Sequence, residues 1–361
     1  MILKEISLQN FRSYQEKEFK FSRGLNLVVG PNTAGKTNLL EAIFLLASRK
    51  SFRAKLETEM INYQSQIARL KGRVEFDSQK ITLEIVLTKG ELNGVKVAKK
   101  KYLVNGVSRR LVDFLENFRV VYFGPQDLEI IINSPSIRRE WLDMVLEQAD
   151  RDYRRASLSY KKGLRQRNRL LEQIRDEGRA KSSLFFWDKL LLENGNLITQ
   201  KRQEFIDFIN QQPKRFGELT VYYDKSVISP QRLAKYAQQE IAAGLTLIGP
   251  HRDDFRVLIN PNRSNPNEAE EGRDLSIYGS RGEQRTAVFN LKLAELEFMT
   301  QKIGARPVLL LDDIFSELDH QRREHLLTVI PKQQTIITTS DIHLVEKKYL
   351  QEMEVIKLNY R

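Results

Sequence analysis

The chain of 361 residues carries 59 Lys and Arg against 47 Asp and Glu, a formal net charge of +12, and it contains no cysteine. Its apolar share of 41% is ordinary for a globular protein and excludes disorder as the main state. It has no run of about 18 apolar residues, so no membrane span is expected, and the lack of cysteine excludes disulfides and thiolate metal sites. The length suggests about two to three domains, and the positive charge suits an anionic partner such as nucleic acid.

The first residues lack the basic and apolar regions of a secretion signal, which with the absence of cysteine predicts a cytoplasmic protein. The pattern of apolar residues over 1–30 predicts a strand, a turn and a second strand that ends at Gly30. A buried helix is expected over 37–48. Residues 67–110 are β-rich and contain Asn93-Gly94 and Asn105-Gly106, so an antiparallel meander is predicted there, followed by a strand over 120–123.

A glycine-rich loop joins the second strand to the first helix. Its sequence, Gly30-Pro31-Asn32-Thr33-Ala34-Gly35-Lys36-Thr37, matches G-x-x-x-x-G-K-[ST] between a strand and a helix. In that context backbone N–H groups point at phosphate oxygens, Lys36 reaches the β- and γ-phosphates, and the Thr37 hydroxyl ligates Mg²⁺. The loop predicts a site for ATP and Mg²⁺. The alternative is a glycine-rich turn with a solvated lysine.

Residues 137–210 have the pattern of two long helices folded back as a hairpin, interrupted near 178–183 and ending near Pro213. Leucine and isoleucine side chains are expected at the seam between them: Leu158, Leu164, Leu171 and Ile174. A further helix is expected over 231–243, ending at Gly244, then a charged loop over 260–273.

The same hairpin carries a strong local charge, because residues 151–170 contain eight cations and one acid. On a helix several of these cations share one stripe, and a second cluster lies in the β-rich region. Few aromatic residues interrupt either cluster, so contact with the phosphates of duplex DNA is predicted rather than base stacking. A solvated helix face is the alternative. The residues predicted to contact DNA are Arg151, Arg154, Arg155, Lys161, Lys162, Arg165, Lys99 and Lys100.

Two further motifs lie near the C-terminus. Ser280-Arg281-Gly282-Glu283-Gln284 opens a helix predicted over 282–301, although Ser280 alone is also an ordinary helix cap. The apolar strand predicted over 308–311 ends in Asp312 and Asp313, and a last strand is expected over 335–338. Ligands of open α/β sheets bind at this end of the strands, so we expect Asp312 to hold Mg²⁺ and Asp313 to polarise the attacking water. A plain turn after a strand is the alternative.

The loop, the serine motif and the acidic strand end, in this chain order, resemble the ATP-binding-cassette superfamily, in which the signature helix meets the nucleotide of a partner subunit. More specific blocks resemble the RecF family of bacterial DNA replication and repair proteins, which are related to SMC-type ATPases. These blocks span nearly the whole chain: Asn10-Phe11-Arg12-Ser13-Tyr14, Lys50-Ser51-Phe52-Arg53, Phe123-Gly124-Pro125-Gln126-Asp127-Leu128, Arg138-Arg139-Glu140-Trp141-Leu142-Asp143 and Gly249-Pro250-His251-Arg252-Asp253-Asp254.

The resemblance implies an α/β fold: an ATPase head with a mixed sheet over 1–125 and 245–361, an antiparallel β lobe at about 65–115, and an inserted helical arm over 126–244. It implies that residues from Asn32 to Asn38 hold the phosphates and that Gln126 contacts Mg²⁺ and water. Arg12 and Arg53 would contact phosphate or the adenine edge, with surface ion pairing as the alternative. Ser280, Gly282, Glu283 and Gln284 would form the contact in trans.

The implied function is that of an ATP-dependent DNA-binding protein which dimerises head to head on ATP, hydrolyses ATP slowly as a DNA-stimulated switch, and helps RecO and RecR load RecA at single-strand gaps. Duplex, gapped or junction DNA would be bound in the bacterial nucleoid. Asp313 replaces a common Glu, Glu283 replaces a frequent Gln, and the switch histidine of transporters is missing near Thr338. The remaining alternatives are a transporter-type ATPase subunit, another SMC-like repair ATPase and an interaction protein with a vestigial loop.

Overall fold

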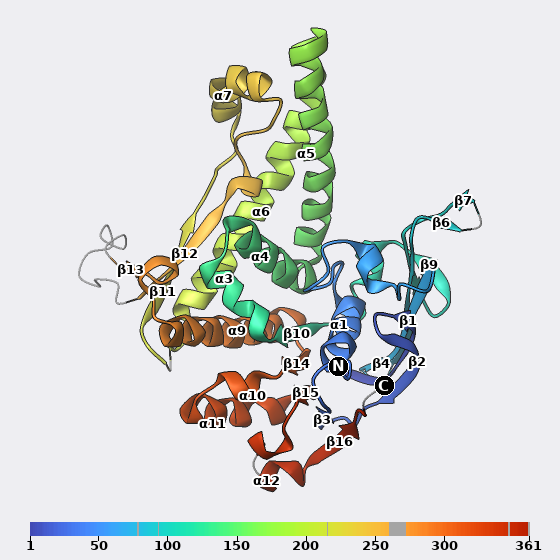
Figure 1. Cartoon of the computed structure of the whole chain (residues 1–361). Coiled ribbons are helices and arrows are strands. Elements are labelled where there is room, and N and C mark those ends of the chain that lie inside the picture. Colours follow the sequence, from blue (N-terminus) through green and yellow to red (C-terminus); the bar gives the residue numbers. More distant parts are fainter. Residues whose placement is uncertain (78, 93, 215, 260–271, 346, 360–361) are drawn as a thin grey trace. The chain divides into compact units, whose positions relative to one another are not determined.

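The computed structural model describes the chain apart from residues 78, 93, 215, 260–271, 346 and 360–361 (Figure 1). It divides into two compact units, the first formed by residues 1–125 and 299–361 and the second by residues 126–298. Most of the predicted charged loop over 260–273 therefore lies outside the described residues. So does Asn93 of the first Asn-Gly pair. None of the described helices is both long and apolar enough to cross a membrane.

A five-stranded sheet forms the centre of the first unit, with all neighbouring strands parallel. Its strands are short, apolar and largely buried, as expected when both faces of a parallel sheet are covered. In spatial order they are β10 (Val120–Phe123), β14 (Val308–Asp312), β15 (Thr335–Thr339), β3 (Leu25–Val29) and β16 (Met353–Lys357). The helices that follow β14 and β15 are α10 (Ile314–Glu317), α11 (His320–Val329) and α12 (Lys347–Leu350).

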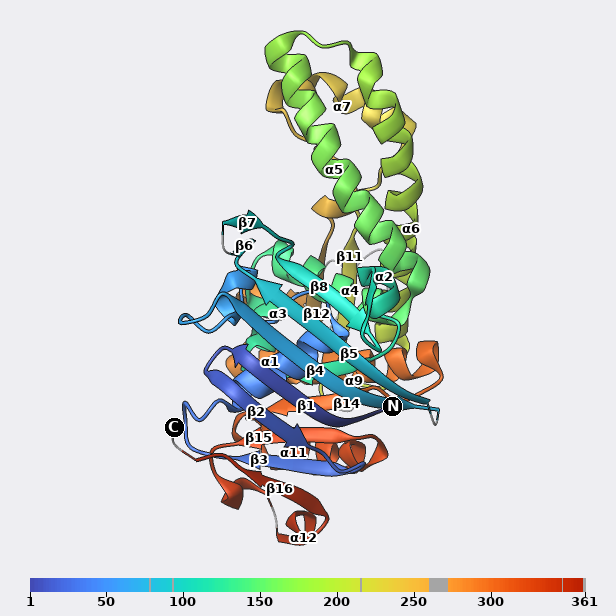
Figure 2. The same ribbon diagram turned by 90° about the vertical axis from the view of Figure 1, so that its right-hand side faces the viewer.

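The predicted antiparallel meander forms a second sheet of six strands in the same unit, seen face on in Figure 2. Alternating buried and exposed residues along β4 show that one face is covered and the other is open. Val104 pairs with Val107 around Asn105-Gly106, which confirms the second predicted hairpin. In spatial order the strands are β2 (Tyr14–Lys20), β1 (Ile2–Phe11), β4 (Ile67–Phe76), β5 (Gln79–Thr88), β8 (Lys100–Val104) and β9 (Val107–Arg109). A small hairpin of β6 (Glu91–Leu92) and β7 (Val95–Lys96) and the short helix α2 (Leu111–Phe114) complete this region.

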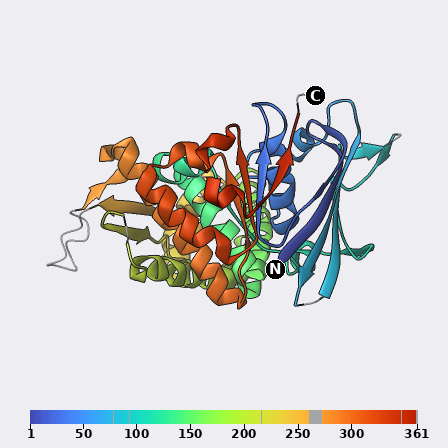
Figure 3. The same ribbon diagram turned by 90° about the horizontal axis from the view of Figure 1, so that it is seen from below.

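Helix α1 (Lys36–Ala47) lies between the two sheets, as Figure 3 shows from below. All its side chains are buried except Thr37 and Asn38, so the helix is apolar on every side and packs as a core element. The predicted buried helix is confirmed. Its N-terminus is held at the C-terminal end of β3, because the two elements are joined only by the loop of residues 30–35.

The second unit is mainly helical, and its longest helices form the predicted hairpin (Figure 2). Asp150 separates two helices where one was predicted, because its carboxylate caps the next helix by accepting from the N–H groups of Asp152 and Tyr153. The seam uses Leu171 and Ile174 as predicted, whereas Leu158 and Leu164 are only half-buried. The helices are α3 (Glu129–Ile132), α4 (Pro135–Ala149), α5 (Arg151–Glu177), α6 (Phe185–Gln211), α7 (Pro230–Ala243), α8 (Leu275–Tyr278) and most of α9 (Arg281–Ile303), whose last residues belong to the first unit.

The second unit continues to Phe298, beyond the predicted arm boundary near residue 244. Antiparallel strands β11 (Leu219–Asp224), β12 (Asp254–Ile259) and β13 (Arg273–Asp274) form a sheet of this unit. An aromatic core accounts for the difference: Trp141 lies 5.4 Å from Phe205 and 5.6 Å from Phe255 between ring centroids, and Phe205 lies 4.6 Å from Phe298. Segments from both sides of residue 244 therefore share one core.

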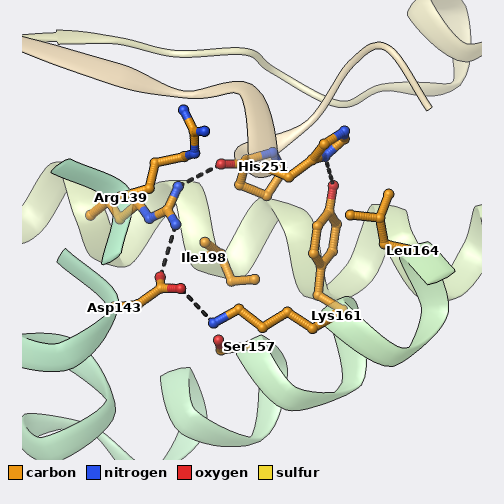
Figure 4. Close-up of a pocket in the computed structure, with 10 residues that line it drawn as sticks. Arg139, Asp143, Ser157, Lys161, Leu164, Ile198 and His251 are labelled. Atoms are coloured by element: carbon orange, nitrogen blue, oxygen red, sulfur yellow. Dashed lines mark hydrogen bonds and ion pairs between the residues drawn. The ribbon is translucent and has the colours of Figure 1, made fainter. Parts of the chain in front are cut away.

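A buried ion cluster ties the base of the helical hairpin to the Gly249–Asp254 motif (Figure 4). The Arg202 guanidinium donates to Asp143 at 2.8 Å, to Asp253 at 2.9 Å and to the carbonyl of Pro250 at 2.7 Å. Burial alone would raise the pKa of Asp143, but the charges of Arg202 and Lys161 hold it well below its usual value. Loss of the buried arginine or of a carboxylate partner would lower the stability of the fold by several kcal/mol, because it would leave a buried charge unpaired. The cluster therefore fixes the helices of the hairpin base against the motif.

The cluster borders a cavity of about 140 Å³ within the second unit (Figure 4). His251 lies on its wall, where Tyr160 donates to Nδ1 over 2.8 Å and Nε2 lies 3.0 Å from the carbonyl of Thr246. Because that carbonyl only accepts, the proton of the neutral imidazole is on Nε2. Burial lowers the pKa of His251 to about 4, so the ring is neutral near pH 7.

Candidate nucleotide-binding site and basic arm

The loop of residues 30–35 has the backbone shape of an anion cradle. Thr33 and Gly35 have φ values of 75° and 102°, in the left-handed region that turns successive N–H groups to one side. A Cβ on Gly30 would lie 2.7 Å from the carbonyl oxygen of Leu358, so only glycine fits there. The first turn of α1 contains no acidic residue, which leaves the positive end of the helix available to phosphate.

Asp312 is the centre of the polar network at the end of β14. Its carboxylate is buried and accepts from the hydroxyl groups of Thr37 at 3.2 Å, Tyr122 at 3.2 Å and Thr338 at 2.7 Å. The structure therefore brings the two residues predicted to bind Mg²⁺, Thr37 and Asp312, within hydrogen-bonding distance although 275 positions separate them. Tyr122 and Thr338 were not predicted as members of this network. Both lie on the strands that flank β14, and their position near the ends of those strands is the signal that could have identified them.

Asp313 has a strained backbone and an unsatisfied side-chain atom. Its φ is 51°, which is rare outside glycine, and its N–H donates to Thr338 at the carbonyl over 3.1 Å. The Oδ1 atom is buried without a hydrogen-bond partner. Burial raises the pKa of Asp313, and the nearby charge of Lys36 opposes that rise. A strained acid with an open oxygen is typical of a catalytic position.

Lys36 is held over the loop rather than in solvent. Its ammonium donates to the carbonyls of Gly30 at 2.7 Å and Pro31 at 3.0 Å. Burial lowers the pKa of Lys36, while Asp313 and Asp312 raise it. The predicted phosphate-binding lysine and both predicted carboxylates thus interact electrostatically in one place.

Arg12 and Arg53 occupy different surroundings. The three nitrogen groups of Arg12 all donate within the protein, two to the buried carboxylate of Glu41 at 2.8 and 2.6 Å and one to the carbonyl of Glu59 at 2.8 Å. Ser51 also donates to Glu41, over 2.5 Å. Arg12 therefore pairs with the buried acid of α1. This corresponds to ion pairing, the alternative to contact with phosphate or adenine. Arg53 is exposed and lies 3.4 Å from Asn38, beside the first turn of α1.

The predicted signature belongs to the second unit and forms a capping box. The Ser280 N–H donates to Glu283 over 2.8 Å, and the Glu283 N–H donates to the Ser280 hydroxyl over 3.3 Å. Gln284 is buried and donates to the carbonyl of Leu275 over 2.9 Å, whereas Ser280 is exposed and Gly282 has open space where a side chain would stand. Gln126 also belongs to this unit and is half-buried in the turn after β10. Its contact with Mg²⁺ and water stays a prediction.

The cations predicted to contact DNA divide into two groups. Arg154 is 1% exposed and donates to the carbonyl of Glu147 over 2.6 Å, and Lys100 is buried against Glu57 at 2.7 Å. Lys161 lies 2.5 Å from Asp143 and 3.2 Å from Glu147. The prediction was wrong for Arg154, which is buried against a main-chain carbonyl, and for Lys100, whose charge is paired with Glu57. Lys161 is paired with two carboxylates.

The remaining cations form an outward stripe on α5. An α-helix turns by about 100° per residue, and on this geometry the exposed cations lie within an arc of about 80° around the axis of α5. We call this the basic stripe; its exposed members are Arg151, Arg155, Lys162, Arg165 and Arg169. Lys99 is also exposed, beside the small hairpin of the first unit.

Known proteins share both the sequence and the architecture of this chain. A family model described as the RecF/RecN/SMC N terminal domain matches residues 2–358. The DNA replication and repair protein RecF of Lachnoclostridium phytofermentans is 37% identical over 354 residues, an alignment that covers 95% of this chain and 93% of that protein. The chain belongs to the RecF family.

Other RecF proteins extend the comparison. RecF of Herpetosiphon aurantiacus is 37% identical over 385 residues, with 98% of this chain and 97% of that protein aligned. A solved structure described as the recombination mediator protein RecF with ATP in the RecFOR pathway is 33% identical, has a TM-score of 0.84, and aligns with 95% of this chain and 93% of its own. The expected fold class and the resemblance to RecF are confirmed.

Replacing Asp313 by Asn tests the strained acid. ATP hydrolysis should fall by about a hundredfold or more, since a positioned base contributes that much. Because the folded state raises the pKa of Asp313, its charged form destabilises the fold above that pKa. D313N should therefore unfold at a higher temperature than the parent near pH 7, and this advantage should shrink as pH falls toward 3.8. Thermal unfolding followed over pH measures the difference; a variant less stable near pH 7 would contradict the assignment.

Proposed function

We propose that this chain is an ATP-dependent DNA-binding protein of DNA replication and repair, in which ATP binding closes a head-to-head dimer and slow hydrolysis reopens it. The observation that carries the proposal is the meeting of Lys36, Thr37, Asp312 and Asp313 at the end of β14. A solved RecF structure described with ATP and another described with ATPrS support the choice of nucleotide.

The residues present fit ATP with Mg²⁺. The loop has left-handed backbone at Thr33 and Gly35 and excludes a side chain at Gly30, as a phosphate cradle requires. Thr37 and Asp312 offer a hydroxyl and a carboxylate, the hard oxygen ligands that Mg²⁺ prefers. In this proposal Mg²⁺ neutralises phosphate charge, Lys36 binds the β- and γ-phosphates, and the open Oδ1 of Asp313 orients water.

The proposed DNA surface is the basic stripe of α5. Its five exposed cations lie on one helix face, separate from Arg154 and Arg167, which are buried. Such a stripe suits phosphate contacts that do not depend on sequence. We further propose that the chain acts with RecO and RecR in loading RecA at gaps, in the bacterial cytoplasm at the nucleoid. The RecFOR pathway named for a related structure supports this context.

Replacing Lys36 by Ala tests the nucleotide switch. Loss of charge-assisted hydrogen bonds to phosphate should weaken ATP binding by about tenfold to a hundredfold. In fluorescence anisotropy the parent should bind duplex DNA more tightly with ATP than with ADP or no nucleotide, and K36A should bind equally in all three. Lys17→Ala, at an exposed lysine of the same unit, is the matched control. Parent binding that ignores nucleotide would refute the switch.

Reversing three charges of the basic stripe tests the DNA surface. The triple variant Arg155→Glu, Lys162→Glu, Arg165→Glu should weaken duplex binding and lower the slope of log K against log salt by about 0.9 per lost contact. ATP affinity should not change, because these residues lie outside the loop. The control reverses Lys17, Lys71 and Lys80, exposed lysines of the first unit, and makes the same change in net charge. Equal DNA affinity of the two triple variants would count against the arm.

Replacing Ser280 by Arg tests the contact in trans. A bulky cation at the start of α9 should abolish ATP-induced dimers in light scattering. ATP affinity should stay within about twofold of the parent, because Ser280 lies outside the loop of residues 30–35. Ser280→Thr keeps the hydroxyl and the capping box and should still dimerise. Dimers of S280R as strong as those of the parent would remove Ser280 from the interface.

A further inference from the structure

A buried lysine stands in the middle of α9, the helix that Ser280 caps (Figure 1). Lys292 is 5% exposed, and its ammonium lies 2.5 Å from Glu295 on the same helix and 3.6 Å from Asp127. Burial alone would lower the pKa of Lys292, but the charges of Asp127 and Glu295 raise it above its usual value, so the group is charged near pH 7. Desolvation offsets the attraction within a buried ion pair, so stability does not by itself account for this charge.

The lysine ties α9 to the turn that carries Gln126. Asp127 follows Gln126 in the turn Pro125–Leu128 after β10. The position of the Asp127 carboxylate therefore restricts the backbone of Gln126, because the two residues are neighbours in a tight turn. The Glu295 carboxylate also accepts from the indole N–H of Trp141 over 2.8 Å, so α4 belongs to the same network.

A second connection joins this turn to Ser280. Helix α3 begins directly after the turn and packs against α8. Helix α8 leads into Ser280, and Gln284 of α9 donates to the Leu275 carbonyl of α8 over 2.9 Å. Ser280 and Lys292 lie about 18 Å apart along one helix, at 1.5 Å per residue. The turn of Gln126, α3, α8 and α9 thus form a closed frame of packed elements, the kind of network that carries coupling between two sites.

We propose that Lys292 and Asp127 are positioning residues that couple the contact in trans at Ser280 to the contact of Gln126 with Mg²⁺ and water in the same chain. This inference rests on the proposed function, in which ATP closes a head-to-head dimer. Docking of Ser280 on the partner's phosphate displaces the start of α9, and the ion pair carries that displacement to the turn. Each copy then places Gln126 for hydrolysis only after its own α9 has docked.

An ion pair suits this role better than an apolar contact. Coulomb attraction declines gradually with distance, so a pair at 3.6 Å still holds when the two elements shift slightly. An apolar contact loses about a quarter to a half of its attraction over about 0.5–1 Å. The pair between Lys292 and Asp127 can therefore keep the turn and the helix together while both move.

The test breaks the link from each side and measures ATP hydrolysis without DNA over a range of protein concentrations. Asp127→Ala frees the turn and leaves Lys292 its pair with Glu295. The double variant Lys292→Met, Glu295→Gln frees the helix, and the new amide oxygen can still accept from Trp141. The parent rate per chain should rise with concentration to a plateau as dimers form. In both variants the plateau should fall by about tenfold to a hundredfold, since a small misplacement costs that much. ATP affinity and the concentration at half-plateau should stay within about twofold of the parent.

A matched lysine of the same unit is the control. Lys201 pairs with Asp150 at 3.1 Å and with Glu204, three residues further on its own helix, at 3.3 Å, which repeats the arrangement around the buried lysine. Lys201→Met should therefore leave both the plateau and the half-plateau concentration unchanged. Asp127→Glu keeps the carboxylate and should recover most of the parent plateau. Thermal unfolding shows which variants are folded at the assay temperature, and Asp127→Ala decides the question if the double variant is not.

Combining the two sets of substitutions separates coupling from independent damage. If both sets break the same link, the triple variant Asp127→Ala, Lys292→Met, Glu295→Gln should have a plateau no lower than that of the weaker of its two parents. Plateaus that fall multiplicatively would overturn the inference, because each set would then act on its own.

The remaining outcomes also decide it. Variants with the parent plateau overturn the coupling and leave the proposed dimer switch intact. So does a fall in rate that follows weaker ATP binding or a higher half-plateau concentration, which assigns the cluster to the packing of the unit. A parent that forms no dimers with ATP refutes the proposed switch, and the coupling fails with it.

Discussion

The buried carboxylate of Asp312 is the interaction on which the first unit depends. Hydroxyl groups from α1, β10 and β15 converge on it, contributed by Thr37, Tyr122 and Thr338. A buried carboxylate is costly unless it is fully hydrogen-bonded, so the strands beside β14 and the start of α1 must reach their positions together. The same constraint that fixes the strands places a hydroxyl and two acids beside Lys36. Fold and nucleotide site are therefore one requirement in this unit.

Helical phase, rather than charge density, decides what each cation of α5 does. Arg154 and Arg167 face inward, and Arg167 pairs with Asp188 and Glu240 at 2.7 Å. Their neighbours Arg155 and Arg165 are exposed. Arg167 thereby joins α5 to α6 and α7, and Arg202 joins segments that are far apart in the sequence at the base of the hairpin. The net charge of the segment therefore overstates the charge available to an anionic partner.

Local patterns predicted the parts of this protein that depend on local chemistry. The phosphate loop, the buried helix after it, the hairpin at Asn105-Gly106 and the strand that ends at Asp312 all follow from neighbouring residues. What the sequence could not supply are partners from distant segments. Glu57, which pairs with Lys100, lies 43 residues away from it in the sequence. The aromatic core that carries the second unit to Phe298 joins residues from four elements.

The capping box at Ser280 sets a limit on how the second unit can meet a phosphate. The Glu283 carboxylate already occupies the N-terminus of α9, and backbone and side-chain bonds from Ser280 lower its pKa. In the proposed contact in trans, a phosphate would therefore meet a helix end that is partly compensated. Arg273, at 2.5 Å from Glu283, neutralises that carboxylate and leaves the Ser280 hydroxyl as the donor that faces solvent. A glutamine at position 283 would leave the positive end of α9 less compensated. In the proposed contact in trans, glutamate would therefore favour a helix that is already capped and attracts phosphate less strongly.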